Sequence, residues 1–172
     1  LDIFFKENRG LTEFDRMVGA FDTTQGINNI TAEVTIAGAT APTLQSILSE
    51  TAAQKSQQGA AAPFAGVMHK LLRYPFNTSV GGTLPVNLPF GPTNGAVIKR
   101  IHVAHGGFVT GMKVKQDGLV VHESTQAENA YEQTQWGLVP QTNIYTVDFV
   151  IDGDMSKAFD TRDAKSVEWL LT

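Results

Sequence analysis

The sequence contains no cysteine among its 172 residues. This absence excludes disulfide bonds, thiolate nucleophiles and thiolate metal sites together. Charged residues are also scarce, at 17%, and the net charge is −4, so the basic surplus typical of a general affinity for nucleic acid is missing. The apolar runs fall far short of the roughly 20 residues that a transmembrane helix needs, and no signal peptide is recognisable. Any chemistry must therefore use histidines, carboxylates and hydroxyls.

The most informative segment is NIYTVDFVIDGD, residues 143–154, in which apolar and polar residues alternate. In an extended chain successive side chains point to opposite faces. One face carries Tyr145, Val147, Phe149 and Ile151, and the other carries Thr146, Asp148 and Asp152. We therefore expect a half-buried strand of a β-sandwich.

Two further segments of the C-terminal part have the same pattern. AVIKRIHVAHGG, residues 96–107, places Val97, Ile101 and Val103 on one face and Arg100 and His102 on the other. MKVKQDGLVVHES, residues 112–124, is typical of a strand, an Asp-Gly turn and a second strand. Helical spacing occurs in this half only at residues 127–136. The sequence therefore predicts a mainly antiparallel, all-β fold.

The N-terminal part predicts a mixture of short elements. We expect strands at residues 1–6 and 29–38, the second with Ile30, Ala32, Val34 and Ile36 facing inward. A short helix is expected around Leu11, Phe14, Val18 and Phe21, and another from Pro42 with Leu44, Ile47 and Leu48 on one face.

Residues 52–66 separate the two parts and consist almost entirely of Ala, Gln, Ser and Gly. Without large apolar side chains this stretch is expected to be a solvated linker, with a poorly packed helix as the alternative.

Both ends of the chain look cut. The chain begins in the strand-like LDIFFK without Met and closes on SVEWLLT, in which Val167, Trp169 and Leu171 alternate. We therefore expect an internal fragment or a chain whose flanks are missing.

The order of the C-terminal pieces carries a family resemblance. In sequence they are LLRYPF (71–76), GGTLPVNLPFGP (81–92), IKRIHVAHGG (98–107), KVKQDGLVVHE (113–123), AENAYEQ (127–133) and YTVDFVIDGD (145–154). This series resembles the major capsid protein of corticoviruses, tailless icosahedral marine phages with an internal membrane. The chain departs from that family in lacking the first strands of a first barrel and the last strand or two of the second. Its low-complexity linker is also longer than the family pattern predicts.

The resemblance implies a double jelly roll. Residues 1–51 would be the final strands of the first jelly roll, residues 52–66 the linker and residues 67–172 the second jelly roll. The implied function is structural, in a homotrimer that tiles an icosahedral virion shell as a pseudo-hexagonal unit. The implied partners are neighbouring capsid trimers, minor capsid and spike proteins and a nearby viral membrane, without direct nucleic-acid contact. No catalytic or cofactor-binding residue is expected.

One acidic segment has the spacing of a calcium loop. Asp152, Asp154, Ser156, Asp160 and Asp163 fall at positions 1, 3, 5, 9 and 12 of an EF-hand register. Lys157 replaces the required Gly, an Asp replaces the bidentate Glu, and a strand precedes the segment instead of a helix. A structural calcium ion is one interpretation, and a solvated turn with capping carboxylates is the favoured one.

Other candidate sites are weaker. His102, His105 and His122 could suggest a metal triad, but His102 and His105 are three residues apart in a strand and point to opposite faces. For His69 the sequence alone indicates no partner. Glu128 and Glu132 share a helical face whose other residues are polar, as on an ordinary solvated helix. Neither a G-x-S-x-G elbow nor a phosphate-binding loop occurs.

The aromatic residues leave one rival function open. Phe76, Phe90, Phe108, Phe149, Phe159 and Trp169 could line a sugar-binding face, although large rings in a sandwich more often fill the core. The alternative function is therefore a carbohydrate- or receptor-binding β-sandwich, such as a spike or lectin-like module. A cupin-type metal enzyme is the third candidate.

Overall fold

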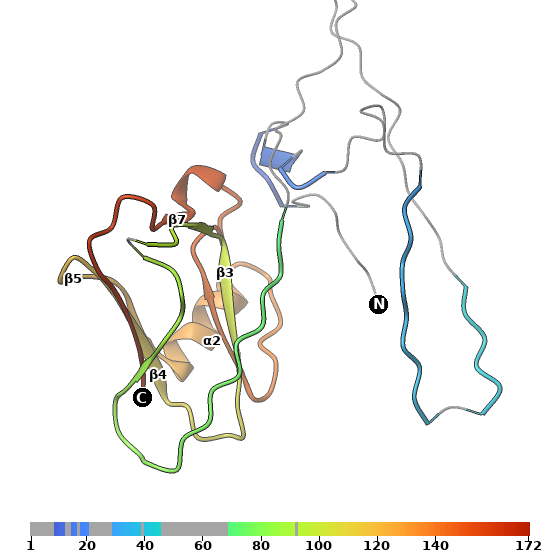
Figure 1. Cartoon of the computed structure of the whole chain (residues 1–172), viewed down its shortest axis with the longest axis horizontal. Coiled ribbons are helices and arrows are strands. Elements are labelled where there is room, and N and C mark those ends of the chain that lie inside the picture. The colour runs from blue at the N-terminus through green and yellow to red at the C-terminus, as the bar shows by residue number, and fades with distance from the viewer. Residues whose placement is uncertain are drawn as a thin grey trace, which may run out of the picture.

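The computed structural model describes residues 9–12, 15–16, 18–20, 29–38, 40–45, 69–91 and 93–172. Its principal elements are β1 (Leu84–Val86), β2 (Val97–Ile98), β3 (Arg100–Ala104), β4 (Gly111–Gln116), β5 (Leu119–Thr125), α2 (Gln126–Gln135), β6 (Ile144–Asp148), the 3-10 helix η1 (Met155–Lys157), β7 (Phe159–Asp160) and β8 (Val167–Leu171). They form a sandwich of strands with a short helix beside it (Figure 1). The predicted all-β class with short helices is confirmed.

The strands pair in a nested order. β1 pairs with β8, β2 with β7, β3 with β6 and β4 with β5, always antiparallel. β8 also pairs with β4, so one sheet has the order β1-β8-β4-β5, and the pairs β2-β7 and β3-β6 form the other side of the sandwich (Figure 1). A long antiparallel hairpin wrapped into two facing sheets in this way is a jelly roll. The jelly-roll prediction is confirmed for this part of the chain.

The turn between β4 and β5 follows directly from its sequence. Asp117 and Gly118 have φ angles of 51° and 81°, and two consecutive positive φ values are what a type I′ hairpin turn requires. The ladder shifts register between Val114 and Lys115, as at a β-bulge. The predicted strand-turn-strand unit at residues 112–124 is therefore confirmed.

The core lies between the two sheets. Its buried members are Met112, Val114, Tyr145, Val147, Phe159 and Trp169. The Phe159 ring stacks on Phe149 with centroids 5.0 Å apart and meets Trp169 edge to face at 5.8 Å. Phe159 belongs to the two-residue strand β7, so one aromatic side chain connects the short second sheet to the long first one.

The alternation predicted for residues 96–107 is wrong at its beginning. Ile101 and Val103 pack against the core as expected, but Val97 is exposed and Ile98 takes the inward position. The ladder breaks at Lys99, whose carbonyl accepts a hydrogen bond from the Phe149 amide at 3.0 Å. That break separates β2 from β3 and shifts the inward face by one residue.

The strand predicted over residues 143–154 is shorter than expected. β6 ends at Asp148 because the carboxylate of this residue accepts a hydrogen bond from the Val150 amide at 3.0 Å, which turns the chain. Val150 is fully buried as a result, whereas Phe149 and Ile151 are only partly buried. The expectation that Tyr145, Val147 and Phe149 share a deeply buried face is confirmed for Tyr145 and Val147, whereas it is wrong for Phe149, which packs against the core but stays partly exposed.

The strand expected at residues 29–38 is absent from the structure, and so is the strand that the family resemblance implies at residues 71–76. Residues 29–38 lie apart from the sandwich (Figure 1), and Ile30, Val34 and Ile36 are exposed instead of facing inward. A strand exists only beside a partner, and no ladder forms with either segment in the described part of the chain. The first strand of the sandwich is β1, inside the GGTLPVNLPFGP segment.

The remaining N-terminal predictions are only partly visible. Asp15 and Arg16 are helical, and Thr12 and Asp15 exchange side-chain and backbone hydrogen bonds at the start of that turn. Residues 40–45 have no regular structure. The strand predicted at residues 1–6, the rest of the helix predicted from Pro42 and the linker at residues 52–66 lie outside the described residues.

A short N-terminal segment docks on the sandwich. The Leu11 amide donates a hydrogen bond to the Gly153 carbonyl at 3.2 Å. Gly153 has a φ of 85°, and a Cβ atom there would overlap the Arg9 carbonyl oxygen. Glycine is therefore required at this position by both the backbone conformation and the close approach of the segment.

Candidate assembly surfaces

The outer edge of the four-stranded sheet is formed by β5, which pairs with β4 alone among the described strands. Its first three residues, Leu119, Val120 and Val121, are 74%, 51% and 43% exposed. Further along, Glu123 pairs with Lys113 of β4 at 2.7 Å. A free strand edge with consecutive exposed apolar residues is a site at which another chain can add.

α2 follows β5 immediately and begins with a capping box. The Thr125 hydroxyl accepts a hydrogen bond from the Glu128 amide at 3.3 Å, and the Glu128 carboxylate accepts one from the Thr125 amide at 2.8 Å. The backbone bond from Thr125 lowers the pKa of Glu128. Glu128 therefore stabilises the N-terminus of the helix, and the predicted helix at residues 127–136 is confirmed with a shift of one residue.

None of the helices in the described ranges is both long and apolar enough to cross a bilayer.

The helix turns polar side chains toward the sandwich. Asn129 and Gln133 are buried. The Asn129 amide donates to the Thr146 carbonyl at 2.6 Å and accepts from the Thr146 amide at 3.3 Å, and Gln133 donates to Asn129 at 2.8 Å. One side chain thus satisfies both backbone groups at the edge of β6, as a neighbouring strand would. Tyr131, on the other side of the helix, is exposed together with Trp136 and Val139.

His122 lies in a partly buried cluster with the hydroxyls of Ser124 and Tyr145. Its Nε2 is 3.3 Å from the Tyr145 hydroxyl, and Ser124 Oγ lies 2.6 Å from the same hydroxyl. Tyr145 also donates to the Ser124 carbonyl at 3.0 Å. Burial lowers the pKa of His122, so the imidazole is neutral at neutral pH. The arrangement connects β5 to β6 through neutral hydrogen bonds.

The other histidines are dispersed. His102 Nδ1 is 3.0 Å from the Thr146 hydroxyl, and His105 Nδ1 accepts from the Gly107 amide at 3.0 Å. His69 Nε2 is 3.3 Å from the Lys99 amine. The structure therefore does not bring His102, His105 and His122 together, in agreement with the argument from strand geometry.

The acidic segment forms a set of turns and ion pairs. Asp152 accepts from the Asp154 amide at 3.0 Å and pairs with Lys157. Asp154 caps η1 by accepting from the Ser156 amide at 2.9 Å. Asp160 pairs with Arg162, which lowers the pKa of that carboxyl to about 2. Within the described ranges no three or more His, Asp and Glu side chains are grouped to hold a metal ion, so the EF-hand spacing does not produce a ligand shell here.

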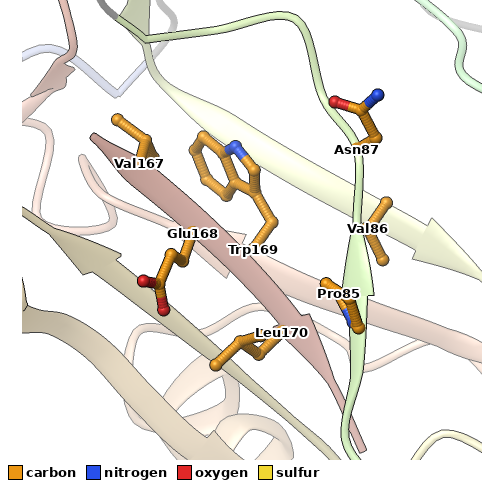
Figure 2. Close-up of a pocket in the computed structure, with 7 residues that line it drawn as sticks. All are labelled: Pro85, Val86, Asn87, Val167, Glu168, Trp169 and Leu170. Carbon is orange, nitrogen blue, oxygen red and sulfur yellow. The ribbon is translucent and has the colours of Figure 1, made fainter. Parts of the chain in front are cut away.

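A shallow groove of about 370 Å³ lies beside β1 and β8. Val167 and Trp169 project to one side of β8 and Glu168 and Leu170 to the other (Figure 2). The indole N–H of Trp169 is buried and has no hydrogen-bond partner in the described part of the chain. The titratable lining residue is Glu168, which pairs with Lys115 at 3.5 Å. The groove thus lacks the paired acid and base that hydrolysis would need.

The aromatic residues are mostly internal. Phe159 and Trp169 are buried, and Phe90 and Phe149 pack against the core. Phe76 and Phe108 are exposed, Phe108 by 89%. The six rings therefore do not form one exposed face of the kind that a sugar-binding module would present.

The family described as viral coat protein P2 C-terminal domain matches residues 68–172. The chain belongs to this family. Among solved structures, the crystal structure of the major capsid protein P2 from bacteriophage PM2 is similar to it, with 26% identity and a TM-score of 0.47. That match covers 52% of this chain and 34% of the phage protein's chain. No curated protein matches the chain. Family membership confirms the resemblance to a viral coat protein and assigns the chain to the virion shell.

Sequence reasoning missed two features of the assembly surfaces. The sequence pattern places Asn129 and Gln133 on a solvated helix face, although two amides four residues apart on one face can indicate a buried hydrogen-bonding pair. The same pattern assigns Leu119, Val120 and Val121 to a regular strand, whereas all three are exposed. Three consecutive apolar residues directly after an Asp-Gly turn cannot all face one core, and that mismatch indicates an exposed edge.

Proposed function

We propose that the chain is part of a double jelly-roll major capsid subunit and that three such subunits form a pseudo-hexagonal unit of an icosahedral shell. The observation that carries the proposal is the match of a coat-protein family to the same residues that form the nested jelly roll. A jelly roll suits this function because its sheets are rigid and its loops and edges can make contacts without disturbing the core.

The surface of the sandwich supports association with like subunits. Large apolar residues are exposed at separate places, on β5, beside α2 and in the loop that contains Phe108. The polar residues of α2 include three glutamines, and its charged residues are Glu128 and Glu132. Surfaces that combine apolar and uncharged hydrogen-bonding groups are typical of contacts between subunits.

The domain organisation and the wider partners belong to the same proposal. Residues 1–51 would complete a first jelly roll, residues 52–66 would connect the barrels and residues 67–172 would form the second. The trimer would contact neighbouring trimers, minor capsid and spike proteins, and its base would face the viral membrane. The role is structural, with neither catalysis nor direct nucleic-acid binding.

Electron cryomicroscopy of shells that contain the chain tests this proposal. We expect pseudo-hexagonal units, each with six barrels upright on the shell surface, and density for residues 84–171 in three of them. Density for this domain on isolated projections above a shell made by other proteins would instead assign it to a spike and contradict the proposal.

A further inference from the structure

Residues 69–76, HKLLRYPF, form an extended segment, and residues 70–76 belong to no strand ladder in the described part of the chain. No backbone hydrogen bond of residues 70–76 occurs in the described part of the chain. The contacts of the segment include that of His69 with Lys99 and the edge-to-face contact of Tyr74 with Phe90 at 5.8 Å. Four of its apolar residues are exposed, namely Leu71, Leu72, Tyr74 and Phe76.

The edge of β5 matches this segment in length and in charge. β5 has seven residues, so the eight-residue segment can span it. The segment carries Lys70 and Arg73 and no acid, whereas residues 119–135 carry Glu123, Glu128 and Glu132 and neither Lys nor Arg. The segment and the first residues of β5 also both expose apolar side chains. We propose that residues 69–76 of one copy add as a strand to the free edge of β5 in a neighbouring copy.

The two sequences favour one direction and one register. Antiparallel pairing of Leu72 with Val121 places Lys70 opposite Glu123 and Tyr74 opposite Leu119. Opposite charges and apolar side chains then meet directly across the ladder, which stabilises a strand pair. Pro75 falls opposite Gly118, just outside β5, where its missing N–H breaks no ladder bond. Parallel pairing would instead place the aromatic end of the segment beside Glu123.

The positions of the two elements allow a closed ring. Residues 69–76 run along the side of the sandwich that contains β3, and β5 lies at the opposite side (Figure 1). A contact that joins different surfaces of identical subunits is heterologous and closes into a ring when the rotation permits. The inference therefore rests on the proposed trimer and specifies the contact that holds neighbouring copies together.

The absence of cysteine makes a cross-linking test direct. Opposed Cβ atoms in a strand pair lie close enough for a disulfide. One copy would carry Leu72→Cys and a second, size-tagged copy Val121→Cys, and the two would be mixed and oxidised. We expect a disulfide-linked species that contains both copies. The matched control pairs Leu72→Cys with Val139→Cys, which replaces a valine that is more exposed than Val121, and should give at most a trace of that species.

The masses of the uncross-linked variants in solution distinguish failure of this contact from failure of the trimer. A trimer in which Leu72→Cys links no better to Val121→Cys than to Val139→Cys would overturn strand addition and leave the proposed trimer intact. Monomers at every concentration would overturn both. In a chain that carries Leu72→Cys and Val121→Cys together, a disulfide that forms only within the chain would also overturn pairing between copies.

Discussion

The Asn129 side chain pairs with both backbone groups of Thr146, donating to the carbonyl at 2.6 Å and accepting from the amide at 3.3 Å. In this jelly roll the position beside β6 is thus occupied by a helix that presents an amide side chain, instead of by another strand. Gln133 holds that amide in place. The edge of β6 is closed within the chain, whereas the outer edge of β5 has no strand partner among the described residues.

Replacement of Asn129 by Asp tests this pairing. The variant keeps the size of the side chain but loses the donor to the Thr146 carbonyl, which leaves a buried acceptor without its bond. We expect the free energy of unfolding to fall by about 1–3 kcal/mol, measured by denaturant titration. Glu132→Gln, at an exposed position of the same helix, is the control and should leave stability nearly unchanged. Equal stability of both variants would show that the amide pair contributes little.

The core prediction uses two phenylalanines in opposite environments. Phe159 is 5% exposed and contacts two other aromatic rings, whereas Phe108 is 89% exposed. Phe159→Ala should lower the free energy of unfolding by about 3–5 kcal/mol because it leaves a cavity in the core. Phe108→Ala should change it by less than about 0.5 kcal/mol. Similar losses in the two variants would contradict the position of the core.

Acid should destabilise the sandwich through His122. Burial lowers the pKa of this residue in the folded state below its value in the unfolded chain, so unfolding takes up a proton. The stability that the neutral imidazole contributes is complete above the unfolded pKa of about 6.5 and is lost as the pH falls through the folded pKa. We expect the melting temperature to fall between pH 7.5 and 5, and to fall less in His122→Gln. An unchanged pH dependence in that variant would exclude His122 as a source.

His102 should contribute to the same acid response. His102 is more exposed than His122, and its pKa is lowered chiefly by partial desolvation and secondly by Arg100, while Asp148 opposes the shift. The sign is therefore the same as for His122. A double variant with glutamine at both positions should show a weaker pH dependence of the melting temperature than either single variant. An unweakened dependence in the double variant would mean that carboxylates dominate the acid response.

Gly153 should control the docking of the N-terminal segment. Gly153→Ala and Gly137→Ala both place a side chain at a positive φ, but only at Gly153 does the new Cβ overlap the Arg9 carbonyl. The amide of Leu11, which donates to Gly153, should therefore exchange hydrogen faster in Gly153→Ala and at the wild-type rate in Gly137→Ala. Accelerated exchange in both variants would trace the effect to backbone strain instead of the contact.

Features that depend on neighbouring residues were predictable from the sequence. The Asp117-Gly118 pair dictates a tight turn whatever surrounds it, and the alternation of Val167, Trp169 and Leu171 matches their packing on the core. Features that depend on distant partners were not. The inward face changes at Lys99 because of a hydrogen bond from Phe149, fifty residues away along the chain.

In the candidate surfaces, too, features set by neighbouring residues were predictable and features set by distant contacts were not. The capping box of Thr125 and Glu128 is a local signal, and it accompanies the correctly predicted helix. The burial of Asn129 depends on the backbone groups of Thr146 at the edge of β6, and that edge exists only in the folded sandwich. Residues 71–76 have the composition of a strand but form none, because a strand needs a partner that the described part of this chain does not supply.

The mass of the protein in solution tests the central claim most directly. Light scattering coupled to size-exclusion chromatography would be measured on the 172-residue chain over a wide range of concentrations. The proposed coat function predicts a species of three times the 18.6 kDa chain mass, with a proportion that rises with concentration. A single species of one chain mass at every concentration would contradict association into a capsid trimer.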